Sequence, residues 1–330
     1  MIDVTQAHRI LFVRTDRLGE TVLNLPAVAV LRRAFPRASL TFLAHPDLQP
    51  LLSQVPEIDD VMPYPPGPRG SWWLRACRMG GRLRARRFDV ALISNPQKEL
   101  HAAVWLAGIP YRVGYARKWG WLLTHRLPDR KALGERHEVE YNLDLIRALG
   151  FPTGAPEWPL PDVSSERKDI DQLLARQGIS CSDQVVVIHP GTSNPLKRWP
   201  TDRFAELIRR VAGHLPVRLV LIGGAEEQEQ AQWLLAHAPS VANVVGQLSL
   251  SQLAALCQRA RLLISNDSGP VHVAAAVGTK TLVLFGTSDA ASGPARWGPW
   301  GTGHAVIWKP TMEAIEVDEV WQALERYLEP

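Results

Sequence analysis

The sequence has few cysteines, no long apolar run and no signal-peptide pattern at its start. Cys77, Cys181 and Cys257 are isolated, which excludes a disulfide framework and a structural zinc site. No uninterrupted apolar run reaches the roughly 18 residues of a membrane span. Met1–Arg9 carries Asp3 and leads directly into an apolar segment, without a basic start, an apolar stretch and a small-residue cleavage site. We therefore expect a cytoplasmic protein.

The composition is that of a soluble globular chain, but its charge is unevenly divided. Hydrophobic residues make up 46% and charged residues 21% of 330 residues, and at about 150 residues per domain the length predicts two domains. Residues 1–160 hold 22 basic and 15 acidic side chains, whereas residues 161–330 hold 15 and 18. A basic half indicates an anionic partner. Arginine makes up 30 of the 37 basic residues and suits phosphate or carboxylate, although genomic base composition explains this bias equally well.

Short apolar runs alternate with amphipathic stretches along both halves of the chain. Strands are expected at residues 9–14, 40–43, 89–93, 185–188, 218–222, 244–245, 262–264 and 281–285. Helices are expected at residues 21–34, 202–213, 227–238, 251–260 and 270–277. This alternation predicts βαβ units, and residues 151–163, with four prolines, form a stiff linker between two doubly wound α/β domains. Ligands of such sheets bind at loops that follow strands.

The first such loop is Arg14–Glu20, between the first strand and the first helix. Gly19 is expected to let the backbone turn tightly, which places Glu20 in the first turn of the helix. The helix dipole favours a carboxylate there, and a carboxylate with a tuned pKa can serve as a general base. From the spacing alone, an ordinary helix-capping acid is the simpler interpretation.

The second loop, His189–Pro200, follows a strand and precedes a helix. Thr192 and Ser193 offer hydroxyl groups, while Lys197 and Arg198 supply positive charge. This combination is able to hold a phosphate group, although a solvated basic turn explains it equally well. The spacing of a Walker A loop is absent.

The third loop, Ser265–His272, opens another helix. Asp267 or Ser268 is the expected N-cap, and Gly269 lies at the start of the helix. Backbone amides at such a terminus bind phosphate. A cap alone does not explain why His272 follows one turn later, so we favour a functional interpretation here.

A glycine pair indicates a candidate ribose contact, while several known motifs are absent. Gly223 and Gly224 follow a strand and precede Glu226 and Glu227, either of which is placed to accept hydrogen bonds from a ribose. No His or carboxylate cluster has metal-ligand spacing, and no serine lies in a nucleophile elbow. No nucleic-acid-binding motif is recognisable, so we expect no nucleic-acid partner.

Together, four segments resemble glycosyltransferase family 9, the family of the ADP-heptose:lipopolysaccharide heptosyltransferases. These segments are Ile10–Ala27, His189–Pro200, Gly223–Gly224 with its neighbouring glutamates, and Ser265–His272, and they occur in the family's order over most of the chain. The resemblance implies a GT-B architecture, in which two Rossmann-like domains face each other across a cleft. Residues 1–160 would bind the acceptor and residues 161–330 the nucleotide sugar, and the architecture allows the final helix to pack back on the N-terminal domain.

The resemblance also implies a reaction and a set of partners. It implies inverting transfer, with ADP-heptose as the donor substrate, with no metal and with no further cofactor. The acceptor would be an acidic glycolipid, the growing lipopolysaccharide inner core. The enzyme would be cytoplasmic with peripheral contact at the inner face of the inner membrane. A related donor or acceptor, and a nucleotide-sugar epimerase of the same architecture, remain alternatives.

Site roles carry over to matching positions. The catalytic positions are Glu20 as the base, Lys197 as the phosphate-binding lysine and Asp267 as the cleft aspartate. The substrate-binding positions are Gly19, Thr192, Ser193, Ser268, Gly269 and His272, together with Glu227 for the ribose and Leu248 against the nucleotide base. In one departure, the family usually has Asp where this chain has Glu20, so the carboxylate reaches one methylene further.

A basic stretch at residues 69–87 begins with Arg69 and includes Trp72 and Trp73. Tryptophan at an interface and arginine toward anionic headgroups suit docking on a membrane surface. The same stretch is able to hold the anionic groups of a glycolipid, and a solvated amphipathic helix is the simplest alternative.

Overall fold

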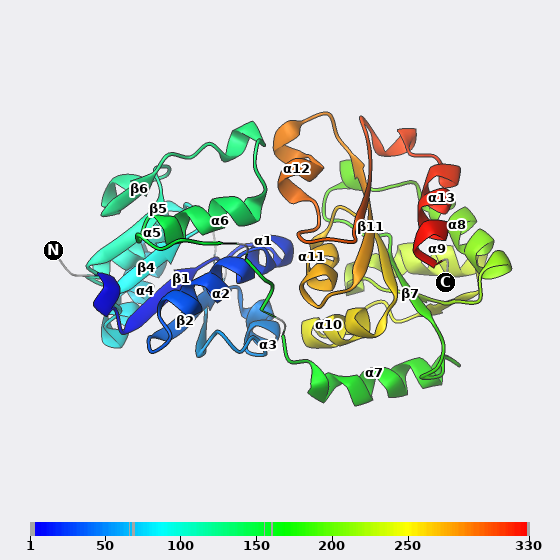
Figure 1. Cartoon of the computed structure of the whole chain (residues 1–330), viewed down its shortest axis with the longest axis horizontal. Coiled ribbons are helices and arrows are strands. Elements are labelled where there is room, and N and C mark those ends of the chain that lie inside the picture. The colour runs from blue at the N-terminus through cyan, green and yellow to red at the C-terminus, as the bar shows by residue number, and fades with distance from the viewer. Residues whose placement is uncertain (1–3, 66, 68–69, 155, 160, 329–330) are drawn as a thin grey trace. The chain divides into compact units, whose positions relative to one another are not determined.

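The computed structural model describes residues 4–65, 67, 70–154, 156–159 and 161–328. The chain divides into two compact units, Met1–Pro161 and Asp162–Pro330 (Figure 1). Each unit is a parallel sheet covered by helices on both faces, and each buries its own apolar core.

The first unit contains a six-stranded sheet in the order β3-β2-β1-β4-β5-β6. Its strands are β1 (Arg9–Val13), β2 (Ser39–Ala44), β3 (Asp60–Pro63), β4 (Val90–Ile93), β5 (Tyr111–Tyr115) and β6 (His125–Leu127). Its helices are α1 (Leu18–Val22), α2 (Leu25–Ala34), α3 (Gln49–Leu52), α4 (Trp72–Arg86), α5 (Lys98–Leu106) and α6 (Glu138–Arg147). Helices α2 and α6 pack together, as do α4 and α5 (Figure 1).

The second unit contains a six-stranded sheet in the order β12-β11-β10-β7-β8-β9. Its strands are β7 (Val185–His189), β8 (Arg218–Leu221), β9 (Val241–Asn243), β10 (Leu262–Asn266), β11 (Lys280–Gly286) and β12 (Ala305–Lys309). Its helices are α7 (Ser164–Arg176), α8 (Thr201–His214), α9 (Gln228–His237), α10 (Leu250–Arg259), α11 (Gly269–Ala276), α12 (Pro294–Trp297) and α13 (Val317–Leu328). The final helix α13 packs on α8 and β12 of its own unit.

The two sheets have the same topology. Counted from the first strand of its own unit, each sheet follows the order 3-2-1-4-5-6, and its strand pairs are parallel. Strands β4, β7 and β10 are buried along their whole length, as expected for a sheet covered on both faces. The strand order reverses between β1 and β4 and between β7 and β10. These two switch points are where a doubly wound sheet binds its ligand.

Three local expectations need correction. The predicted helix at residues 21–34 is two helices, because the chain forms a turn at Leu23–Asn24 before α2 begins at Leu25. The predicted strand at 244–245 is wrong: β9 covers Val241–Asn243, and Val244 and Val245 are buried in the turn that follows it. Gly19 does not form a tight turn, since it lies inside α1, where its carbonyl accepts from the backbone N–H of Leu23 (3.0 Å).

Candidate functional site

At the switch point of the second unit, a buried histidine joins the ends of two strands. His189 ends β7, and its Nδ1 lies 3.1 Å from Oγ of Ser265 in β10 and 3.0 Å from Oγ of Ser268. The two serine hydroxyls are 2.9 Å apart. The second and third predicted loops are therefore held together by a polar network at the carboxyl edge of the sheet.

The carboxylate of Glu227 enters the same network from the glycine pair after β8. Its Oε2 accepts from the backbone N–H of Gly224 (2.8 Å) and lies 3.5 Å from Nε2 of His189. A Cβ built on Gly191 would lie 1.5 Å from Oε1 of Glu227, and one on Gly223 would lie 2.5 Å from Oε2. Both glycines are therefore needed for the close approach of this carboxylate to the backbone.

The surroundings of Glu227 favour its charged form. Burial alone would raise the pKa of this carboxyl group, but its hydrogen bond and charge interaction with His189, and the N–H of Gly224, together lower the pKa below its ordinary value. Glu226, the other candidate from the sequence, is exposed. The geometry thus distinguishes two neighbours that the sequence left equivalent, since only Glu227 enters the polar network.

A lysine–aspartate ion pair joins the second and third loops. Nζ of Lys197 donates to Oδ2 of Asp267. The two residues are 70 positions apart in the chain. Burial raises the pKa of Asp267, while the lysine charge opposes that shift. Asn266 braces the loops, because its side chain accepts from the backbone N–H of Trp199 (3.1 Å) and donates to the carbonyl of Pro190 (2.7 Å).

The remaining predicted donor residues lie on the same loops or next to them. Thr192 is buried, and its Oγ1 accepts from the backbone N–H of Asn194 (3.3 Å), whereas Ser193 is exposed. Leu248 is half-buried between β9 and α10.

The third loop opens α11 in an unusual way. Ser268 occupies the N-cap of α11, and Gly269 is the first residue of the helix. The Ser268 side chain makes no capping hydrogen bond, because it is turned toward His189 and Ser265. His272 is buried within α11. The start of this helix therefore offers backbone N–H groups that the Ser268 hydroxyl does not cap, the arrangement that binds an anion at a helix N-terminus.

In the first unit, Glu20 lies in the first turn of α1, immediately beyond the carboxyl end of β1. Burial raises the pKa of its carboxyl group, and the nearby charge of Asp16 raises it further. Asp16 itself accepts from Nε of Arg14 (2.6 Å). A raised pKa brings Glu20 closer to the range in which a general base works efficiently.

A buried charge network beside Glu20 was not predicted from the sequence. Arg14 and Glu138 are both buried, and NH1 of Arg14 lies 3.2 Å from Oε1 of Glu138. Nζ of Lys131 lies 2.6 Å from the same oxygen, and NH1 of Arg14 is 3.4 Å from Oγ of Ser94 at the end of β4. No spacing signal links these residues, since Arg14 and Glu138 are 124 positions apart.

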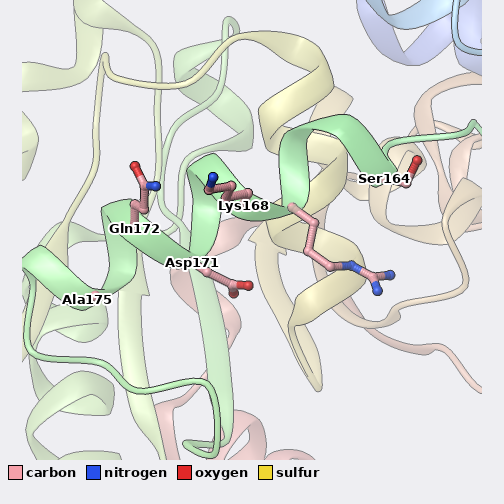
Figure 2. A pocket seen from close by; sticks show the side chains of 6 residues that line it. Ser164, Lys168, Asp171, Gln172 and Ala175 are labelled. Atoms are coloured by element: carbon pink, nitrogen blue, oxygen red, sulfur yellow. The ribbon is translucent and has the colours of Figure 1, made fainter.

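A surface depression of about 540 Å³ runs along α7 (Figure 2). No predicted site residue lines it. It is lined by Ser164, Arg167, Lys168, Asp171, Gln172 and Ala175. Within the part of the chain that the structure describes, no three His, Cys, Asp or Glu side chains are grouped to hold a metal ion.

Comparisons with known proteins agree with these features. The family model described as glycosyltransferase family 9 (heptosyltransferase) matches residues 76–325. Lipopolysaccharide heptosyltransferase 2 of Salmonella typhimurium is 27% identical over 85% of this chain and 83% of its own. A family 9 glycosyl transferase structure from Veillonella parvula has a TM-score of 0.88 at 23% identity, covering 97% of both chains. The structure of E. coli ADP-heptose lps heptosyltransferase II has a TM-score of 0.82 at 24% identity, covering 97% of this chain and 98% of that one.

The predicted fold class, an α/β chain of GT-B type with two Rossmann-like domains, is confirmed.

Proposed function

Since the chain belongs to glycosyltransferase family 9, we propose that this glycosyltransferase moves a heptose from ADP-heptose to the inner core of lipopolysaccharide. The observation that carries the donor half of this proposal is the polar cluster at the β7/β10 switch point. There Lys197, Glu227 and the start of α11 combine a cation, a hydroxyl-accepting carboxylate and backbone amides. A nucleoside diphosphate presents the complementary groups, which are an anionic diphosphate and the two hydroxyls of a ribose.

In the proposed donor complex, each group has a separate task. Lys197 and the amides after Ser268 bind the diphosphate, with Thr192, Ser193 and His272 at neighbouring positions. Glu227 accepts hydrogen bonds from the ribose, and Leu248 packs against the base. As the bond between the sugar and the diphosphate breaks, negative charge grows on the leaving ADP. Lys197 then stabilises the transition state more than the ground state.

We assign the role of general base to Glu20. Its carboxylate removes the proton of an acceptor hydroxyl, and the hydroxyl oxygen then attacks the anomeric carbon from the face opposite the departing ADP. The configuration at that carbon is therefore inverted. The raised pKa of Glu20 favours this role, since a stronger base takes the proton more readily.

We further propose that no metal ion and no separate cofactor take part. In this mechanism, Lys197 and the α11 amides supply the charge that a divalent cation supplies in other nucleotide-sugar enzymes. Activity with ADP-heptose should then be unchanged by EDTA. Loss of activity in EDTA that a divalent ion restores would contradict this part of the proposal.

The acceptor is proposed to bind the first unit as an acidic glycolipid at the cytoplasmic face of the inner membrane. The net charge of +7 in residues 1–160 suits an anionic acceptor. None of the helices in the described residues is both long and apolar enough to span a bilayer. Membrane contact would therefore be peripheral for this part of the chain.

The direct test is to incubate the purified protein with ADP-heptose and truncated core acceptors and to measure acceptor mass. We expect a gain of one heptosyl residue that requires both substrates. A gain only with another nucleotide sugar would replace the donor. Conversion of a nucleotide sugar in the absence of any acceptor would indicate an epimerase instead.

A further inference from the structure

Tryptophan side chains from two separate segments, and a lysine from a third, meet on the surface of the first unit. The ring of Trp72, at the start of α4, contacts the ring of Trp119 edge-on, with centroids 5.1 Å apart. Trp119 in turn lies 5.9 Å from Trp121, and Nζ of Lys98, at the start of α5, lies 4.4 Å above the ring of Trp72. Beneath them, Trp72 packs on the buried side chains of Ala76, Ala102 and Leu122. We call Trp72, Trp119 and Trp121 the tryptophan face.

Most of this face is open to solvent. Trp121 is 67% exposed and Trp119 41%. Trp73, which follows Trp72 on α4, is 53% exposed. Several large aromatic rings left in water at one place mark a surface that another molecule covers.

The turn that presents Trp119 has a strained backbone, which a hydrogen bond from a neighbouring helix stabilises. Lys118 and Trp119 have φ angles of 47° and 68°, so two successive bulky residues adopt the left-handed conformation that favours glycine. Such strain persists only where the surrounding structure holds it in place, and it gathers at functional surfaces. Here Nδ1 of the buried His101 donates to the carbonyl oxygen of Lys118 (2.9 Å). Burial lowers the pKa of His101, which keeps the ring neutral while it makes this bond.

The charge around the tryptophan face is positive. Lys98 and Lys118 are exposed, and within the described ranges neither forms an ion pair. Arg78 and Arg82 are exposed further along α4. The acidic groups nearby are already paired. Glu99 is buried and binds Arg75 through both oxygens (2.6 and 2.5 Å). Asp129 is 3.1 Å from Arg117. Arg69, which belongs to the same basic stretch in the sequence, lies outside the described residues.

We propose that the tryptophan face docks the protein on an anionic lipid bilayer. Tryptophan prefers the boundary between headgroups and acyl chains, and exposed lysine and arginine add attraction to anionic headgroups. Single-stranded nucleic acid fits less well, because Trp72 and Trp119 contact each other edge-on and are not spaced for bases to stack between them.

The location of this face links docking to the reaction. Helices α4 and α5 begin where β3 and β4 end, so Trp72 and Lys98 lie at the carboxyl edge of the sheet. Glu20 lies at the same edge, since α1 follows β1. Docking would therefore bring the edge that carries Glu20 to the surface in which a glycolipid is anchored. This last step rests on the proposed function, whereas the docking itself does not.

The test is cosedimentation of the full chain with vesicles of phosphatidylcholine alone or with 30% phosphatidylglycerol. We expect binding to the anionic vesicles that weakens as salt is raised, because added ions screen the lysine and arginine charges. Lys118→Gln should weaken this binding about fivefold, the effect of one basic residue near the surface. Trp121→Ser should weaken it by a similar or larger factor.

Matched controls lie in the second unit. Trp233 is 40% exposed, and Arg209 is exposed on α8. Trp233→Ser and Arg209→Gln should bind the anionic vesicles as the wild type does. Equal binding of wild type and face variants would overturn the proposal, as would absence of vesicle binding at low salt. A concentration-dependent dimer that Trp121→Ser abolishes would show that a second copy covers the face instead.

A transfer assay separates docking from catalysis. With a delipidated, soluble acceptor, Trp121→Ser and Lys118→Gln should match wild-type turnover, whereas with acceptor embedded in anionic vesicles both should be slower. Loss of turnover on the soluble acceptor as well would assign the face to acceptor recognition and overturn docking. A wild type that binds vesicles but transfers nothing to either acceptor would contradict the proposed function and leave docking intact.

Discussion

The two sheets share one strand order but place very different chemistry at their switch points. At β1/β4, the buried side chains of Arg14 and Lys131 both lie against the buried carboxylate of Glu138. At β7/β10, the ion pair of Lys197 and Asp267 spans two loops and remains partly exposed on the lysine side. A buried network fixes geometry, because removing one member leaves another charge unpaired, whereas an exposed cation is able to exchange its partner for a ligand.

This difference indicates a division of labour between the units. At the first switch point, the carboxylate of Glu20 lies beside the buried charge network of Arg14 and Glu138, and among the described residues Glu20 itself forms no ion pair. The second unit gathers donors and acceptors suited to a diphosphate and a ribose. Variants at the first switch point should therefore change the chemical step, and variants at the second should change donor binding, transition-state charge or both.

Glu20→Gln should show the largest effect. Glutamine keeps the size of glutamate but cannot take a proton, so turnover should fall by roughly 100-fold or more, the usual contribution of a general base. The affinity for ADP, measured by calorimetry, should stay at the wild-type value, because the donor groups lie in the other unit. Glu20→Asp should retain turnover well above Glu20→Gln, since it preserves the carboxylate at a shorter reach.

Three results would contradict this assignment. A Glu20→Gln enzyme as active as wild type would move the base elsewhere, with Asp16 or Asp267 as the first residues to test. Glu20→Asp as inactive as Glu20→Gln would show that reach, and not basicity, limits the reaction. Lower ADP affinity in either variant would show that the chemistry of the two units is not separate.

Lys197→Ala should have the second-largest effect on turnover. Loss of one group that stabilises developing charge costs on the order of 3 kcal/mol in the barrier, or about 100-fold in turnover. The Michaelis constant for the donor should change less than turnover does. Lys168→Ala removes an exposed lysine on α7, apart from the predicted site residues, and is the matched control, which should stay close to wild type. A rise in the Michaelis constant alone would make Lys197 a ground-state anchor.

Removing Lys197 also leaves Asp267 as an unpaired buried carboxylate, and this needs its own control. The double variant Lys197→Ala with Asp267→Asn removes both charges. If its turnover matches that of Lys197→Ala, or is lower, the loss belongs to the missing cation. Recovery toward wild type in the double variant would instead assign the loss to the stranded carboxylate.

Glu227→Gln should act more weakly and mainly on the donor. A hydrogen bond to a charged group contributes about 1.5–3 kcal/mol, so ADP affinity should fall by roughly tenfold or more. Glu226→Gln changes the exposed neighbour by the same chemistry and should leave ADP affinity unchanged. Equal effects of the two substitutions would contradict the assignment of the ribose to Glu227.

The sequence predicted which loops carry the site, but it did not predict which of their side chains pair with one another. Apolar runs at β1, β7 and β10 were recognisable because parallel strands are buried on both faces, and the polar loops after them stand out from those runs. The ion pair of Lys197 with Asp267 was not predicted, since pairing across 70 residues depends on which strands are neighbours in the sheet. The same holds for Glu138, whose spacing gives no sign that it meets Arg14.

The backbone conformation of individual residues was also hard to predict from the sequence. Glycine after a strand usually marks a tight turn, yet Gly19 is helical, because the chain has already bent at Asp16 before α1 begins. The left-handed conformation of Lys118 and Trp119 has no sequence signal either, since neither residue favours it. Tertiary contacts override local preference at such positions, and here the contact is the bond from His101 to the carbonyl of Lys118.

Asp16→Asn should have the smallest effect, a shift in the pH profile. Only ionised Glu20 accepts a proton, so kcat/KM should fall as pH drops through the pKa of Glu20. The Asp16 charge helps to raise that pKa, and its removal should also leave Arg14 less neutralised, which lowers the pKa further. The acid limb should therefore move to lower pH, while the plateau rate changes little. A shift to higher pH, or no shift in an otherwise active Asp16→Asn enzyme, would show that Glu20 does not govern the acid limb.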